Sequence, residues 1–301
     1  MTQLVGIFLN VLVPVFSLVL LGYLTAPRLQ LETRTLSRYA YFVLTPALVF
    51  VTLSQTRIEV ALAGRMIGFI TLVYTGTIVI AFVIARLLRR PAAMTAAYVM
   101  IAAFGNVGNF GLPIVQFAEG PEALGLATLY FLANLVLAFI VCVTAANFSR
   151  GINLGMVGRV FRTPALIALA PALAVNGLNI TLPAVVTRPL ELLSAALIPT
   201  MLIVLGAQLS EAGIPRLNPD MLISSAIRLI GGPLIAFSTV AWFALPPLER
   251  NVGILQASMP TAVLVSIIAM ENRLLPEFVT ATVLFSNVIS ITTLAVVLLL
   301  L

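Results

Sequence analysis

The sequence predicts an all-α integral membrane protein of ten transmembrane helices, arranged as two inverted repeats of five helices each. Three observations carry this prediction. Apolar side chains make up 61% of the 301 residues and charged ones only 9%, whereas about a quarter of the residues of a typical soluble domain are charged. The apolar residues fall into ten runs, each roughly long enough to cross a bilayer as a helix. Several short motifs also recur, in the same order, in the two halves of the chain.

The composition excludes several classes of function. The chain has no His, and its single Cys142 lies in an apolar run, so no disulfide forms within the chain. Zinc sites, haem sites and His-based acid–base catalysis therefore lose their usual side chains. The net charge of +6 does not indicate nucleic acid, because membrane proteins place basic residues beside their spans. We expect no enzyme activity, no cofactor, no metal and no nucleic-acid partner.

The ten spans are separated by Arg, Gly and Pro residues. The first lacks the basic start of a signal peptide and is too long for its apolar core, so we expect it to be retained. The predicted spans cover residues 4–24, 36–53, 66–88, 94–117, 123–148, 161–178, 190–209, 221–245, 252–270 and 277–300.

Arginine counts predict the orientation, because cytoplasmic connections are rich in basic residues. Every basic residue in the chain is Arg. The odd-numbered connections hold eleven: Arg28, Arg34, Arg38, Arg86, Arg89, Arg90, Arg150, Arg159, Arg162, Arg216 and Arg273. The even-numbered connections hold four: Arg57, Arg65, Arg188 and Arg250. We therefore expect a multi-pass protein of the cell (inner) membrane with both termini outside the cytoplasm.

An internal repeat gives the topology. The matches, offset by 153 to 155 residues, are Pro46 with Pro199, Gln55 with Gln208, Ile80-Ala81-Phe82 with Ile235-Ala236-Phe237, and Ala127-Thr128 with Ala281-Thr282. Five spans per repeat is an odd number, so the second half enters the membrane from the opposite side. Inverted repeats of this kind are typical of secondary transporters. We expect residues 1–150 to form the first repeat and residues 151–301 the second.

Spans four and nine are predicted to break near the middle of the bilayer. Span four contains the sequence GNVGNFGLP, which ends at Pro113, and span nine contains QASMPT, which includes Pro260. Gly, Asn and Pro are poor in a helix interior, but Pro fits the first turn of a new helix. We expect fresh half-helices to begin near these two prolines.

Two half-helix starts that face each other would attract an anion, because a helix start presents unpaired N–H groups and a partial positive charge. Broken backbone at this depth must line protein or a water-filled cavity, and a small carboxylate is a natural ligand there. The alternative is that these residues only kink and pack helices. The candidate substrate-binding residues are Asn106, Gly108, Asn109, Gly111, Pro113, Ser258, Pro260 and Thr261.

Other polar residues in the spans have two interpretations each. Gln55, Gln208 and Asn287, the repeat partner of Asn134, either line the cavity or bond neighbouring helices. Gln256 and Glu271 are candidates for binding a coupling cation.

Arg228 lies roughly 10 Å inside span eight at 1.5 Å per residue. We expect it to extend its head to the interface, the alternative being that it attracts an anion. No Asp or Glu lies well inside a span, which argues against proton coupling. Uniport is the simplest reading, and coupling to Na⁺ or H⁺ stays open.

The broken spans resemble a known family. Two sets of residues resemble the two crossover motifs of the auxin efflux carrier family. The first is Gly105-Asn106 followed by Gly111-Leu112-Pro113, and the second is Gln256-Ala257-Ser258-Met259-Pro260 with Ala269-Met270-Glu271. That family includes plant auxin carriers and bacterial carriers assigned to malonate and related organic acids. The resemblance covers essentially the whole chain.

The resemblance implies a fold like that of bile acid:sodium symporters, with crossing broken helices. Spans one, two, six and seven would form a scaffold, homodimeric through spans two and seven, and spans three to five and eight to ten a moving core. The family's carboxylate-binding asparagine maps onto Asn106, and a substrate-contacting position in span five maps onto Asn134. Unlike plant members, this chain has no long loop between spans five and six and no Asp or Lys in span three.

We therefore expect a secondary transporter that moves a small organic anion, such as malonate, another dicarboxylate or an auxin-like acid, by elevator-type alternating access. The alternatives are a sodium- or proton-coupled symporter of the same fold, a passive channel, a structural membrane subunit and an intramembrane enzyme. The last lacks a credible catalytic constellation.

Overall fold

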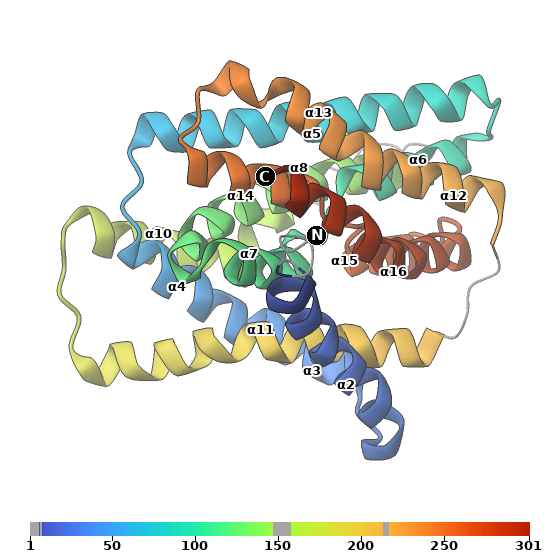
Figure 1. The fold of residues 1–301 in the computed structure, drawn as a ribbon. Coiled ribbons are helices and arrows are strands. Elements are labelled where there is room, and N and C mark those ends of the chain that lie inside the picture. Colours follow the sequence, from blue (N-terminus) through green and yellow to red (C-terminus); the bar gives the residue numbers. More distant parts are fainter. Residues whose placement is uncertain (1–5, 7, 147–157, 213–216) are drawn as a thin grey trace.

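The computed structural model describes residue 6 and residues 8–146, 158–212 and 217–301. Every regular element in these residues is helical (Figure 1). Within the described residues, seven helical stretches are long and apolar enough to cross a membrane: Leu9–Leu29, Thr33–Gln55, Val60–Leu87, Pro121–Cys142, Ala184–Glu211, Pro219–Phe243 and Pro276–Leu300. The described part of the chain is therefore all-α, and its long apolar helices are typical of an integral membrane protein.

The described residues of the first half form seven α-helices. They are α2 (Val13–Leu29), α3 (Thr33–Tyr39), α4 (Thr45–Gln55), α5 (Val60–Leu87), α6 (Ala92–Ala103), α7 (Leu112–Glu119) and α8 (Leu124–Ala146). Short π-helical turns precede three of them: η1 (Phe8–Leu12), η2 (Ala40–Leu44) and η3 (Val107–Gly111).

The second half also combines long and short helices. It contains α10 (Pro164–Gly177), α11 (Ala184–Ala212), α12 (Pro219–Ala226), α13 (Gly232–Thr239), α14 (Pro247–Ala257), α15 (Val263–Glu271) and α16 (Pro276–Leu300). The π turn η6 (Ile227–Gly231) joins α12 to α13.

Prolines at the start of four helices explain these π turns. Pro14, Pro46, Pro113 and Pro233 each lie in the first turn of a helix, directly after η1, η2, η3 and η6. A proline has no N–H and clashes with the carbonyl one turn back. One widened turn accommodates that defect without ending the helix. The spans through α4 and α13 therefore continue across their prolines.

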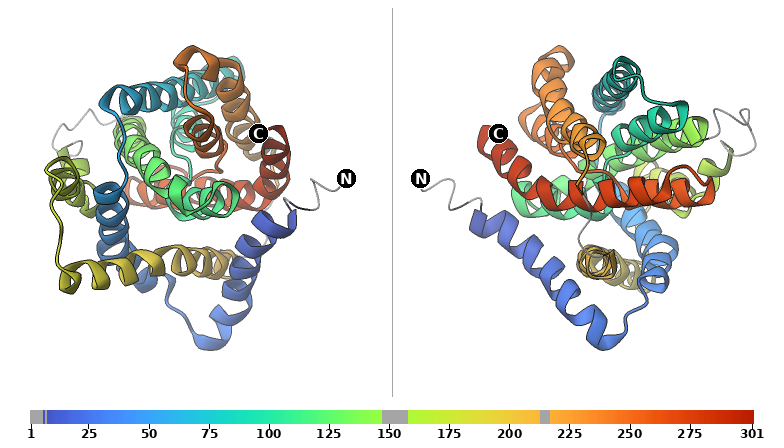
Figure 2. Two further views of the ribbon diagram at one scale, coloured as in Figure 1. Left: turned by 60° about the vertical axis from the view of Figure 1, so that its left-hand side comes forward. Right: turned by 90° about the vertical axis from the view of Figure 1, so that its right-hand side faces the viewer.

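One group of helices is formed by α2, α3, α4, α10 and α11. The helix α2 packs along α11, and α4 packs on α10 and α11. The backbones of α2 and α11 touch, because a Cβ on Gly22 would collide with the carbonyl of Ile203 and one on Gly206 with that of Val19. Figure 2 shows α2 and α11 on one side of the molecule, with α12 and α13 on the opposite side.

The other group is formed by α5–α8 and α12–α16. The helix α5 packs on α6, α8, α13 and α14, and α16 packs on α12 and α15. Buried side chains of α5, including Phe69, Val73 and Tyr74, join a core with residues of α8 and α14. This group contains both interrupted spans.

Several helix bounds differ from the predictions. The helix α11 begins at Ala184, before the predicted start at residue 190, because it continues through Pro189 into the exposed residues Arg188 and Val185. The helix α2 likewise extends to Leu29 through Pro27. In contrast, α10 has only 14 residues, about 21 Å at 1.5 Å per residue. The predicted ends at residues 4 and 148 lie outside the described residues.

Candidate binding site

Two helix interruptions meet inside the second group. The helix α6 ends at Ala103 and α14 ends at Ala257, and the segments that follow them run antiparallel. The backbone N–H of Asn106 donates to the carbonyl of Pro260 (2.6 Å), and that of Ala262 donates to the carbonyl of Phe104 (2.8 Å). Each segment thus satisfies backbone groups that the other segment's broken helix leaves unpaired.

Three buried asparagines hold these segments. The side-chain amide of Asn134, on α8, donates to the carbonyl of Gly105 (3.2 Å), and that of Asn287, on α16, donates to the carbonyl of Thr261 (3.0 Å). The amide of Asn106 donates to Oδ1 of Asn287 (3.0 Å). The structure therefore brings together Asn106, Asn134, Asn287 and Thr261, all of which the sequence put forward.

The hydroxyl groups nearby are bonded within the protein. Ser286 Oγ accepts from the backbone N–H of Thr261 (3.2 Å), and Thr261 Oγ1 donates to the carbonyl of Ile101 (3.3 Å). Ser258 Oγ donates to the carbonyl of Ile254 (2.7 Å) in its own helix. Thr261 and Ser258 thus support the interruption.

A cavity of about 270 Å³ opens beside this meeting point. One wall comes from α3, η2 and α11, through residues that include Arg38, Tyr41, Met201 and Gln208. The opposite wall comes from residues 104–109, α8 and α15, through residues that include Asn106, Gly108, Asn109, Phe131 and Ile267. The cavity therefore lies between the two groups of helices.

The cavity contains only part of the predicted set. Asn106, Gly108, Asn109 and Gln208 line it. Gly111, Pro113, Asn134, Ser258, Pro260, Thr261 and Asn287 are buried around the meeting point and are not among its lining residues. Gln55 is exposed at the last position of α4 and also lies outside the lining.

Arg38 is a lining residue that sequence reasoning did not put in the site. It was counted only as a marker of the cytoplasmic side. It lies on the short helix α3, is exposed, and is one of the residues that line the cavity. One feature of the sequence could have indicated Arg38. It lies eight residues before Pro46, which is in the first turn of α4, and Thr45 at the start of that helix lines the same cavity.

The expectation that Arg228 extends to the interface is wrong. Its side chain is 0% exposed. Nε donates to the carbonyl of Met259 (2.8 Å), Nη1 to that of Ala102 (3.2 Å), and Nη2 to that of Ala257 (3.2 Å) and to the Tyr74 hydroxyl (3.1 Å). The guanidinium also lies over the Tyr74 ring, 4.7 Å from its centre. The ends of α6 and α14 provide unpaired backbone carbonyls, and the guanidinium donates to these carbonyls instead of extending to the membrane–water interface.

Gln256 and Glu271, the two candidates for binding a coupling cation, have different surroundings. Gln256 is buried near the end of α14 and donates through Nε2 to the carbonyl of Ala127 (3.4 Å). Glu271 is exposed at the last position of α15, and the nine residues of that helix span about 13 Å. Within the described part of the chain, Gln256 Oε1 and Asn134 Oδ1 are buried oxygens with no hydrogen-bond donor.

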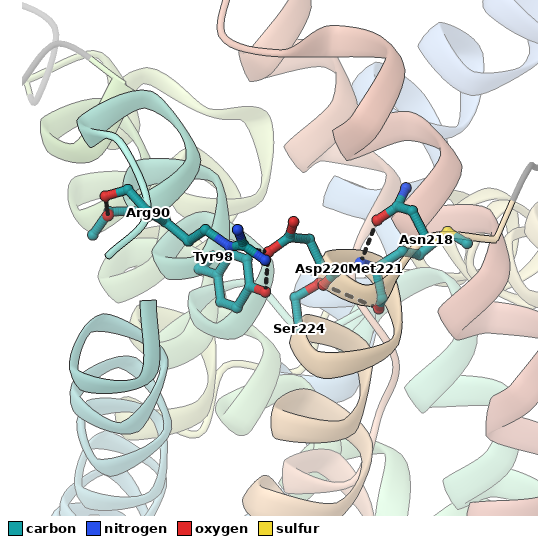
Figure 3. Close-up of polar contacts among 7 residues, drawn as sticks. Arg90, Tyr98, Asn218, Asp220, Met221 and Ser224 are labelled. Atoms are coloured by element: carbon teal, nitrogen blue, oxygen red, sulfur yellow. Dashed lines mark hydrogen bonds and ion pairs between the residues drawn. The ribbon is translucent and has the colours of Figure 1, made fainter. Parts of the chain in front are cut away.

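A polar cluster ties α6 to the start of α12 (Figure 3). Arg90 Nε lies 2.8 Å from Asp220 Oδ1, and the Tyr98 hydroxyl donates to the same oxygen (2.7 Å). Asn218 caps α12 by accepting from the backbone N–H of Met221 (2.9 Å). The cluster joins the two halves of the chain at one end of the group that holds the interruptions.

Comparison with known proteins places the chain among membrane transporters. The model of a family described as membrane transport protein matches residues 7–153 and 144–298. An "Uncharacterized transporter" of Methanothermobacter thermautotrophicus is 27% identical over 287 residues, which cover 93% of this chain and 94% of that protein. A "Putative malonate transporter" of Rhizobium meliloti is 26% identical over 307 residues, covering 97% and 94%.

Proposed function

Because the chain belongs to the membrane transport protein family, we propose that it is a secondary transporter that moves a small organic anion across the cell membrane by alternating access. As a member of this family it is a membrane transporter and not an enzyme. The observation that carries the proposal is the cavity that ends on Asn106, Gly108 and Asn109, where two interrupted helices meet.

An inverted repeat of ten spans accounts for the helix arrangement. The seven long stretches, the shorter α10 and the two interrupted pairs α6/α7 and α14/α15 make ten segments. In such a repeat, span one (α2) corresponds to span six (α10), and span two (α4) corresponds to span seven (α11). A contact between α2 and α11 therefore predicts an equivalent contact between α10 and α4. Both contacts are present. Asn134 and Asn287 likewise each bond the interrupted segment of their own half.

The substrate site is proposed at the face of the cavity formed by residues 104–109. The start of η3, with Gly108 and Asn109, offers a partial positive charge to a carboxylate. The side chain of Asn106 has a second N–H beyond the one given to Asn287. On this face of the cavity the donors to a carboxylate are neutral groups.

A dicarboxylate fits the distribution of charge in the cavity. One carboxylate occupies the donors at Asn106 and Asn109, and Arg38 attracts the second from the opposite wall. Malonate is the first candidate, and the name of the Rhizobium meliloti relative agrees with it. An acid with one carboxylate and an apolar body is the second candidate, because Phe104, Phe131 and Ile267 also line the cavity.

The position of the cavity between the two helix groups supports an elevator motion. We assign α2, α4, α10 and α11 to the scaffold, which dimerises through α4 and α11, and α5–α8 with α12–α16 to the moving core. The cavity lies toward the arginine-rich connections, since Arg38 and Gln208 are near the ends of α3 and α11. By the positive-inside rule this conformation faces the cytoplasm, with both termini outside.

Counterflow of labelled malonate in proteoliposomes tests the function. Asn106→Ala is expected to weaken apparent affinity or rate by about tenfold to a hundredfold, because a hydrogen bond to a charged group contributes about 1.5 to 3 kcal/mol. Asn272→Ala is the matched control, since Asn272 bonds only its own helix turn at Ile268 among the described hydrogen bonds.

Three outcomes separate the alternatives. Malonate counterflow in Asn106→Ala equal to that of the wild type would refute the site assignment. Absence of counterflow for a panel of mono- and dicarboxylates would refute the function. Resolvable unit currents in planar bilayers would identify a channel instead.

A further inference from the structure

Arg228 has an unusual environment for a charged side chain in a membrane protein. Among the described residues it is the one charged side chain that is fully buried. Its contacts are three backbone carbonyls, one hydroxyl and one aromatic ring, with no carboxylate among them. A buried charge is costly unless fixed dipoles or an opposite charge compensate it.

The compensation comes from the ends of two helices. Ala102 is the penultimate residue of α6, Ala257 is the last residue of α14, and Met259 follows two residues later. A helix C-terminus presents unpaired carbonyls equivalent to about half a negative charge. Two such ends converging on one guanidinium balance about one positive charge. The convergence exists because both helices stop at the same depth, where their segments pair.

Carbonyls at interrupted transmembrane helices are also the groups that bind a co-transported sodium ion in secondary transporters. In this protein the guanidinium of Arg228 already takes three of them. The positive charge that a coupling ion would bring is therefore part of the chain.

The same charge lies directly behind the proposed anion site. A Cβ on Gly105 would collide with Arg228 Nη2 and with the Tyr74 hydroxyl, so the guanidinium packs against the backbone beside Asn106. Arg228 is not among the cavity-lining residues. It acts on an anion through its field, which is strong at this depth because the surroundings have a low dielectric constant.

We propose that Arg228 is the built-in cation of the transport core. It takes the place of a co-transported cation against the carbonyls of α6 and α14 and supplies the positive potential that draws an anion to Asn106. Transport is therefore independent of sodium and proton gradients. This inference rests on the proposed function and concerns whether that transport is coupled to an ion gradient.

The first experiment measures malonate uptake by wild-type proteoliposomes at fixed membrane potential. Replacing sodium by N-methyl-D-glucamine, or collapsing the pH gradient with a protonophore, is expected to leave the initial rate unchanged within error. A rate that requires sodium or an imposed pH gradient would overturn the proposal.

The second experiment restores the cation to a variant that lacks it. Arg228→Ala is expected to lose uptake and to unfold at a lower temperature, and low-millimolar guanidinium is expected to recover part of both. Guanidinium is expected to have no effect on the wild type or on Arg86→Ala, which removes an exposed arginine from the end of α5. Wild-type uptake by Arg228→Ala, or a loss that guanidinium does not change, would overturn the proposal.

Two further variants separate charge from packing if Arg228→Ala does not fold. Arg228→Lys keeps the charge and is expected to retain sodium-independent uptake, whereas Arg228→Gln keeps hydrogen-bond donors and is expected to lose it. Equal uptake by the two would contradict the proposal. If the wild type carries none of the acids tested, the proposed function fails, but guanidinium stabilisation of Arg228→Ala still tests the role of Arg228.

Discussion

Glycine residues decide how closely polar groups approach at the meeting point of the interrupted helices. Gly105 leaves the space that Arg228 and Tyr74 occupy, and a Cβ on Gly111 would collide with Oε1 of Gln256. The sequence indicated these glycines as helix breakers. Their role in close packing could not be predicted, because the groups that touch them come from α5, η6 and α14, far away in the chain.

Gly105→Ala is expected to destabilise the protein by about 1 to 3 kcal/mol, the usual cost of overpacking a close-packed site. Gly64→Ala is the matched control, because a Cβ there meets nothing within 4 Å, and the change is expected to be neutral or slightly stabilising in a helix. Thermal unfolding in detergent measures both. An unfolding temperature of Gly105→Ala equal to that of the wild type would show that the guanidinium can move away.

Arg38→Gln is expected to raise the KM for malonate by up to about fivefold, since an exposed ion pair contributes up to about 1 kcal/mol. Uptake of a monocarboxylate is expected to change less, because it lacks the second charge. Arg34→Gln, on the same helix but outside the cavity lining, is the control. Equal effects of Arg38→Gln on both kinds of acid would exclude a contact with a second carboxylate.

At the scale of helices, hydropathy predicted apolar helices in the right parts of the chain, but it did not predict where several of them end. Proline helped to separate the predicted spans, but Pro27 and Pro189, which were expected to lie outside the spans, are inside α2 and α11. A span is interrupted where a second segment supplies hydrogen bonds, as Pro260 does for Asn106. That partnership joins residues 154 positions apart, so local propensity could not reveal it.

The interpretation of Arg228 failed for the same reason. Its distance from the end of a span predicted an extended side chain, and the competing carbonyls lie on α6 and α14. The resemblance to auxin efflux carriers, drawn from the two interrupted spans, is confirmed by the family match. The resemblance was informative because motifs of Gly, Asn and Pro indicate where the backbone departs from a regular helix, which hydropathy does not indicate.

The contact between α6 and α12 is expected to depend on one hydroxyl. Tyr98→Phe removes the donor to Asp220 and is expected to lower the free energy of unfolding by about 1 kcal/mol or somewhat more, since the acceptor is charged. Tyr23→Phe, at an exposed position of α2, is the control. If thermal unfolding is unchanged in Tyr98→Phe, water replaces the tyrosine hydroxyl as the donor to Asp220, and this hydrogen bond does not stabilise the contact between α6 and α12.

At the scale of the whole molecule, the two helix groups are expected to move relative to each other. Met201, on α11, and Ile267, on α15, face the same cavity from opposite walls. In a background with Cys142→Ser, the pair Met201→Cys and Ile267→Cys is expected to stop malonate counterflow when a thiol cross-linker joins them, and reduction is expected to restore it. Each single cysteine variant with the same reagent is the control. Full transport after complete cross-linking would contradict an elevator motion.

The amide of Asn287 has a consequence for how fast a solute is released. It donates to the carbonyls of both Thr261 and Val283, at 3.0 and 2.8 Å, so its oxygen can only face Asn106. That oxygen accepts from the Asn106 side chain and fixes its rotamer before any solute binds. The Asn106 side chain therefore loses little conformational entropy on binding. At the proposed site, binding of a solute is therefore expected to need no rearrangement of Asn106 and its release to break few bonds, which suits rapid turnover at modest affinity.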